Sequence, residues 1–150
     1  MRLVAQIASV LRLLRKEDEM AQLPGDKRVL LIVDDEEDTG LAMKAILERA
    51  GYAAEWASCG AEAIEKARHR VFDLIFLDIH LPEMSGLDIF RELKKINSGI
   101  KVCLMTGWPK GVATHIADCL VMLEEGAIDK MLRKPFSREE ILDVAKELLG

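Results

Sequence analysis

Val29-Leu-Leu-Ile-Val-Asp-Asp-Glu36 is the most informative stretch of this sequence, an aliphatic run that ends in three acidic residues. A strand with no polar face is expected in the centre of a parallel sheet, where helices cover both sides. Leu74-Ile-Phe-Leu77 is a second apolar run, and Asp78 follows it. We therefore expect two central parallel strands, each with a carboxylate at its end.

Outward from these runs, short aliphatic segments alternate with longer amphipathic ones. The expected strands are 28–33, 53–57, 72–77, 101–105 and 129–132, and the expected helices are 38–50, 60–69, 86–96, 111–125 and 138–149. Gly51 and Gly126 follow two of the helices as C-caps, and Ser137 with Glu140 predicts a capping box. Five β-α units predict a doubly wound α/β domain over residues 28–149.

Composition and charge exclude several classes of protein. The 150 residues are 50% hydrophobic and 31% charged, which excludes a disordered or collagen-like chain. The net charge of −5 argues against a direct nucleic-acid partner, because such surfaces need clustered Lys and Arg. No apolar run reaches the roughly 18 residues of a membrane span. The cysteines Cys59, Cys103 and Cys119 lack zinc-ligand spacing, and no cleavage site follows the N-terminal apolar stretch, so we predict a cytoplasmic protein with reduced thiols.

Residues 1–27 are predicted to be an extra N-terminal helix and a linker. One helical stripe carries Leu3, Ile7, Val10 and Leu14. Pro24-Gly25 then separates this helix from the domain. The stripe lasts only two heptads, fewer than a coiled coil needs. Docking on the chain's own domain and pairing in a homodimer both stay open.

Polar residues collect where the predicted strands end, which is the edge at which parallel sheets bind ligands. Asp34-Asp35-Glu36 follows the first strand, Asp78 the third and Thr106 the fourth, and the fifth leads into Lys134. Neighbouring carboxylates oppose one another's ionisation unless a cation neutralises them. Hard oxygen ligands without His or Cys predict Mg²⁺, and Thr106 and Lys134 would hold phosphoryl oxygens. Acids at a helix N-terminus explain the first run alone, but not the joint placement.

These residues resemble the receiver domain of two-component response regulators. The matching pieces are 29–36, Phe72-Asp-Leu-Ile-Phe-Leu-Asp-Ile-His-Leu-Pro-Glu-Met-Ser-Gly-Leu-Asp88, Met105-Thr-Gly107 and Lys134-Pro-Phe136. In this order and spacing they cover nearly all of 28–149. The resemblance implies a flavodoxin-like strand order 2-1-3-4-5, and a signalling domain that catalyses only its own phosphorylation and dephosphorylation.

The resemblance also implies roles for the residues at the strand ends. Asp78 would accept a phosphoryl group from the phosphohistidine of a sensor histidine kinase or phosphotransfer protein, and an ionised carboxylate needs no general base for this attack. Asp35 and Asp78 would ligate Mg²⁺ together with the backbone carbonyl of His80, while Asp34 would act through water.

Two further residues would respond to the phosphoryl group. Lys134 would pair with it, and Thr106 would move to hydrogen-bond it, which is the switch. The resemblance further implies a cis peptide bond between Lys134 and Pro135.

The sequence departs from the family pattern in the switch region. Met131 stands where the family usually has Tyr or Phe, and Met lacks the planar ring that would report the switch. The segment from Thr106 to Lys134 is several residues longer than expected, so the helix at 111–125 or its flanking loop should be extended. His80 and Trp108 stand where relatives carry residues that tune loss of the phosphoryl group, and we expect Trp108 to shield the site from water.

Two other functions compete with the phosphoacceptor interpretation. A pseudo-receiver would keep the pocket for protein interaction without control by phosphorylation. A hydrolase of the aspartyl-phosphate type would need a second acid two residues after Asp78, where this sequence has His80. Residues 1–27 are too few for a DNA-binding module, so we expect a stand-alone receiver that contacts a downstream protein, or one receiver within a longer chain that has an output domain.

Overall fold

The computed structural model describes residues 6–7, 27–107, 120, 124 and 128–150. Of the predicted N-terminal helix it therefore describes Gln6 and Ile7, and of the predicted helix 111–125 it describes Leu120 and Glu124, all four with helical backbone. The rest of both segments, Trp108 and most of the extended region before Lys134 lie outside the described residues. None of the helices that the structure describes is long and apolar enough to span a bilayer.

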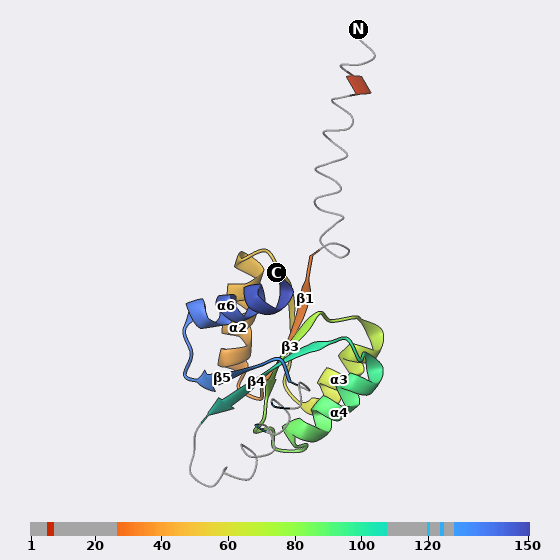
Figure 1. Cartoon of the computed structure of the whole chain (residues 1–150), viewed down its shortest axis with the longest axis vertical. Helices are drawn as coiled ribbons and strands as arrows, with labels where there is room; N and C mark the ends of the chain where they lie inside the picture. The colour runs from red at the N-terminus through yellow and green to blue at the C-terminus, as the bar shows by residue number, and fades with distance from the viewer. Residues whose placement is uncertain (1–5, 8–26, 108–119, 121–123, 125–127) are drawn as a thin grey trace.

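Five strands form one parallel sheet in the order β2-β1-β3-β4-β5 (Figure 1). Their bounds are β1 Val29–Val33, β2 Ala53–Ala57, β3 Leu74–Asp78, β4 Lys101–Gly107 and β5 Lys130–Lys134. This confirms the predicted α/β fold and its strand order. The order reverses direction between β1 and β3, so these central strands end at the switch point where such sheets bind ligands.

Four described helices cover the two faces of the sheet (Figure 1). Their bounds are α2 Glu37–Arg49, α3 Gly60–His69, α4 Gly86–Ile96 and α6 Arg138–Leu149. One apolar cluster joins the strands to α3 and α4, and a second joins them to α2 and α6. Along β1, Leu31 and Val33 enter the first cluster while Leu30 and Ile32 enter the second, as the period of a strand requires.

Several predicted strands shift at their ends for physical reasons. β3 begins at Leu74 rather than at residue 72, and just before it the side chain of Asp73 accepts a hydrogen bond from the backbone N–H of Val29 at 2.8 Å. β4 and β5 run beyond their last apolar residues, since the ladder continues through the pairs Thr106 with Arg133 and Gly107 with Lys134. Backbone pairing therefore carries both strands into the functional residues.

Two of the predicted signals at the helix ends are confirmed, and the third, Gly126, lies outside the described residues. The Ser137 side chain accepts a hydrogen bond from the backbone N–H of Glu140, whose own side chain accepts one from the backbone N–H of Ser137. This is the predicted capping box, and it fixes the start of α6 directly after Lys134-Pro135. Gly51 follows α2 with a φ of 100°, the left-handed conformation that favours glycine.

Candidate functional site

The buried polar side chains of the described residues are those of Asp34, Asp78 and Thr106, which are 0%, 4% and 3% exposed. Asp34 directly follows β1, Asp78 ends β3, and Thr106 lies near the end of β4. The parallel register pairs Val33 with Leu77, so Asp34 and Asp78 extend the same pair by one residue. The sequence placed these residues at one edge of the sheet, and the fold brings them together there.

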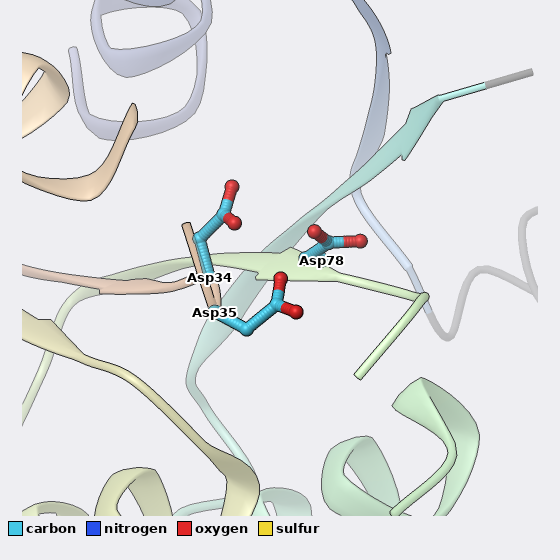
Figure 2. A group of neighbouring side chains, drawn as sticks. All are labelled: Asp34, Asp35 and Asp78. Carbon is cyan, nitrogen blue, oxygen red and sulfur yellow. The ribbon is translucent and has the colours of Figure 1, made fainter. Parts of the chain in front are cut away.

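Asp35 completes a cluster of three carboxyl groups with Asp34 and Asp78 (Figure 2). Each group offers one oxygen, and these oxygens all lie within 4.8 Å of one another. Asp34 and Asp35 leave the chain at consecutive positions after β1, while Asp78 reaches the cluster from the neighbouring strand (Figure 2). Asp35 is exposed to solvent, so the cluster opens to water on its side.

Lys134 lies between the two buried carboxylates. Its Nζ donates to Asp34 Oδ2 at 2.7 Å and to Asp78 Oδ2 at 3.0 Å. The predicted cis peptide bond between Lys134 and Pro135 is present. A residue 100 positions away from Asp34 in the chain thus neutralises part of the acidic cluster.

Backbone groups hold the other carboxylate oxygens. The N–H of His80 donates to Asp78 Oδ1 at 2.8 Å, and the N–H of Glu36 donates to Asp34 Oδ1 at 2.9 Å. The carboxyl groups of Asp34 and Asp78 therefore each accept a hydrogen bond from a backbone N–H on one oxygen and from Lys134 on the other. Since Asp34 has a donor on each oxygen, Asp35 is the more available carboxylate for a further ligand.

Burial and charge shift the ionisation of the site in two directions. Burial raises the pKa of Asp78; the N–H of His80 and the Lys134 ammonium oppose this, and the Asp34 carboxylate adds to it. Burial alone would lower the pKa of Lys134, but its hydrogen bonds to Asp34 and Asp78 outweigh burial and raise it. Lys134 therefore stays charged, while Asp78 ionises less readily than a free carboxyl group.

The donor set fits a hard divalent cation. Three ionised carboxylates and one ammonium leave two negative charges uncompensated. All three side chains offer oxygen, the ligand that Mg²⁺ prefers, and an exposed group such as Asp35 lets the ion keep several waters. These residues meet the predicted requirements for Mg²⁺.

The other predicted residues lie around this cluster with different degrees of contact. Thr106 follows Met105, the partner of Asp78 in the β3–β4 ladder, and its hydroxyl donates only a long 3.4 Å bond to the carbonyl of Gly107. Met131 pairs with Leu104 and packs, half-buried, against the cluster under α3 and α4. The side chain of His80 is also half-buried.

Two features of the site have no counterpart in the sequence analysis. Trp56 donates from its indole N–H to the backbone carbonyl of Asp34 at 2.8 Å. A cavity of about 490 Å³ also opens beside Lys134, lined by Glu36, Thr39, Gly107, Lys134, Pro135 and Phe136. The sequence pattern of β2 gives no signal for the hydrogen bond from Trp56. The cavity forms only where the start of α2 meets the turn between β5 and α6.

The fold and the acidic cluster at the end of its central strands indicate a signalling domain of the receiver type, and comparison with known proteins agrees on the family. Residues 30–146 match the family model of the response regulator receiver domain. The chain belongs to this family. The chain is therefore a response regulator receiver domain of the kind found in two-component systems.

Among curated relatives, the chain is 38% identical over 120 residues to the transcriptional regulatory protein CusR of Escherichia coli, covering 80% of this chain and 50% of the relative. It is 31% identical over 128 residues to the transcriptional regulatory protein ZraR of Klebsiella oxytoca, covering 85% of this chain and 28% of the relative. The chain thus spans about half or less of the length of these curated relatives.

Among solved structures, a CheY-like response regulator receiver domain protein from Methanospirillum hungatei has a TM-score of 0.72 and 29% identity, with 81% of this chain and 92% of that chain covered. A two-component response regulator from Clostridium difficile has a TM-score of 0.71 and 26% identity, with coverage of 82% and 96%. These structures are similar to the described domain over nearly their whole length.

Proposed function

We propose that Asp78 accepts a phosphoryl group from the phosphohistidine of a sensor histidine kinase or phosphotransfer protein, in a reaction that depends on Mg²⁺. The observation that supports this proposal is the position of Asp78: a buried carboxylate at the end of a central strand, held by Lys134 and the N–H of His80 beside two further carboxylates. The intact pocket disfavours a pseudo-receiver.

In the proposed reaction an Asp78 oxygen attacks phosphorus while the bond from phosphorus to the imidazole nitrogen breaks. The electron pair of that bond returns to the imidazole of the donor, and the product is an aspartyl phosphate. Asp78 needs no general base because it reacts as a carboxylate. Lys134, whose Nζ lies 3.0 Å from Asp78 Oδ2, offers its ammonium to the incoming phosphoryl oxygens.

Asp35 and Asp78 would hold the cation directly, with the backbone carbonyl of His80, and Asp34 would reach it through water. The hydrogen bonds support the direct contact of Asp35, because no described residue donates to its exposed carboxylate. Asp34 and Asp78 each have a donor on both oxygens, so their different roles rest on the resemblance to receiver domains. When bound, Mg²⁺ neutralises charge that develops on the phosphoryl oxygens.

Thr106 would act as the switch. Its hydroxyl is 3% exposed but makes only a 3.4 Å bond to the carbonyl of Gly107, so a phosphoryl oxygen on Asp78 offers it a stronger acceptor. Movement of Thr106 would reach Met131, which lies on the adjacent strand. Met fills the space without a ring that rotates, so the signal would pass by repacking along β4 and β5.

The output is proposed to be a downstream protein or an output domain in a longer chain. The relatives CusR and ZraR are named transcriptional regulatory proteins, and the chain covers only their receiver-sized part, which supports such an output. Free cysteines at Cys59 and Cys103 support work in the reducing cytoplasm.

The test is intact mass after incubation with acetyl phosphate and Mg²⁺, with and without chelator. We expect the wild-type protein to gain one phosphoryl group in a reaction that needs the cation, and Asp78→Asn to gain none. Asp143→Asn makes the same change on the exposed side of α6 and should react like the wild type. Absence of any gain in the wild type would favour the pseudo-receiver.

A further inference from the structure

The peptide group that joins Asp34 to Asp35 is tied to the end of β2. The N–H of Asp34, which belongs to the preceding peptide group, donates to the carbonyl of Ala57 at 3.1 Å and continues the strand ladder. The carbonyl of Asp34 accepts from Trp56 Nε1 at 2.8 Å, which no ladder would supply. Because a peptide group is planar, fixing this carbonyl also fixes the plane from which the Asp35 chain departs.

Gly40 makes this contact sterically feasible. It lies in the first turns of α2 and is buried, and a Cβ at this position would lie 2.3 Å from both Cδ1 and Nε1 of Trp56. Glycine inside a helix costs about 1 kcal/mol relative to alanine, so the helix itself gains nothing from it. Its presence lets the polar edge of the indole pass under α2 to reach Asp34.

We propose that Trp56 is a positioning residue of the cation site: its indole N–H holds the Asp34–Asp35 peptide so that the Asp35 carboxylate faces Asp78. The inference rests on the proposed function only for the identity of the ion, Mg²⁺. Trp56 touches no cation and no phosphoryl group. It orients the residues that would bind the cation, as hydrogen-bond partners of metal ligands commonly do.

A purely structural role for the ring makes a different prediction. Trp56 also packs, half-buried, at the edge of the cluster under α2 and α6, so its loss costs stability whichever role it has. Only the positioning role links the indole N–H to the affinity for the cation. Phenylalanine keeps an aromatic ring and removes the N–H, which separates the two roles.

The experiment is a calorimetric titration of each full-length protein with MgCl₂ alone, without any phosphodonor. We expect Trp56→Phe to weaken Mg²⁺ binding roughly three- to tenfold, the effect of one lost hydrogen bond that orients a ligand. The matched control is Tyr52→Phe, which removes a polar group from a half-buried ring just before β2 and should bind like the wild type. Gly40→Ala, which displaces the indole, should weaken binding as Trp56→Phe does.

Unchanged Mg²⁺ affinity in a folded Trp56→Phe protein would overturn the inference, even if its urea midpoint falls. The sequence has two tryptophans, so Trp108→Phe leaves Trp56 as the only tryptophan, which excitation at 295 nm observes without the tyrosine. If Trp56→Phe fails to fold, the fluorescence of the Trp108→Phe protein provides the test. We expect Mg²⁺ to change the Trp56 emission, and no change would refute the inference. A wild-type protein that binds no Mg²⁺ would refute the cation site itself. Equal Mg²⁺ binding by the wild type and by Trp56→Phe would refute only the positioning role of Trp56.

Discussion

Replacing the proposed phosphoacceptor with asparagine should stabilise the metal-free protein. Asp78→Asn removes the attraction to Lys134 Nζ at 3.0 Å, worth about 5.5 kcal/mol at an effective dielectric constant of 20. It also removes repulsion from Asp34, whose carboxylate oxygen lies within 4.8 Å of that of Asp78, worth about 3.5 kcal/mol. Solvent screens the exposed Asp35, so its repulsion is smaller. Attraction and repulsion therefore nearly cancel, and relief of carboxylate burial, the main cause of the raised pKa of Asp78, leaves a net gain of about 1.5 kcal/mol.

The assay is urea unfolding at pH 7 in the presence of a chelator. A gain of about 1.5 kcal/mol raises the urea midpoint by roughly 0.5–1.5 M for the usual range of m-values. Saturating MgCl₂ should reverse the order of the two proteins, because the cation binds and stabilises the wild type through the ionised Asp78. Asp143→Asn, the exposed control, should leave the midpoint unchanged in both buffers.

The pH dependence gives the same prediction a second form. Burial raises the pKa of Asp78, so the folded wild type takes up a proton at a higher pH than the unfolded chain does. Its stability therefore increases as the pH falls from 7 towards about 4, while Asp78→Asn has no such group, and the difference between the two proteins should close over that range. A metal-free Asp78→Asn protein that is less stable than the wild type at pH 7 would refute the reasoning.

Three other changes test separate parts of the structure. Lys134→Met should destabilise the metal-free protein by about 3 kcal/mol in urea, because two buried carboxylates lose their cation; equal stability would show that the ion pairs contribute nothing. The Cys103 thiol, whose pKa burial raises to about 12, should resist iodoacetamide at pH 8 while the half-buried Cys59 reacts, as mass spectrometry of peptides would show; modification of Cys103 in the folded protein would contradict this. Ser137→Ala should lower stability by about 1 kcal/mol through loss of the α6 capping box, and an unchanged urea midpoint would exclude that contribution.

The sequence predicts the fold well because the two central strands, β1 and β3, are buried on both faces. The helices at 60–69, 86–96 and 138–149 and the strand at 53–57 occur with the predicted bounds. The strand ends are less well predicted, since apolar runs stop at Met105 and Leu132 while backbone pairing continues to Gly107 and Lys134. Hydrophobicity marks where a strand is buried, but hydrogen bonding determines where it ends.

Some residues of the candidate site could also be predicted from the sequence, and one could not. The side chains of Asp34, Asp78 and Lys134 could be placed together from sequence, because each follows an apolar run and parallel strands end at one edge. The indole of Trp56 could not, because its contact with Asp34 depends on the absence of a side chain at Gly40, on a different element. A periodic sequence pattern identifies buried residues along one helix or strand. It does not identify a hydrogen bond that depends on the space left by a glycine on a different helix.

The position of Lys134 shows how the fold and the chemistry constrain each other. β5 is an edge strand of the sheet, and its hydrogen-bonded ladder with β4 fixes the backbone position from which the Lys134 side chain extends towards Asp34 and Asp78. The ammonium balances only one of the three carboxylates, so the apo site retains a net charge of about −2, which a divalent cation neutralises. A second lysine in the cluster would lower the net charge to about −1 and so weaken the attraction for a divalent cation. The single lysine therefore keeps the pocket stable enough to fold and acidic enough to bind the ion on which the proposed phosphoryl transfer depends.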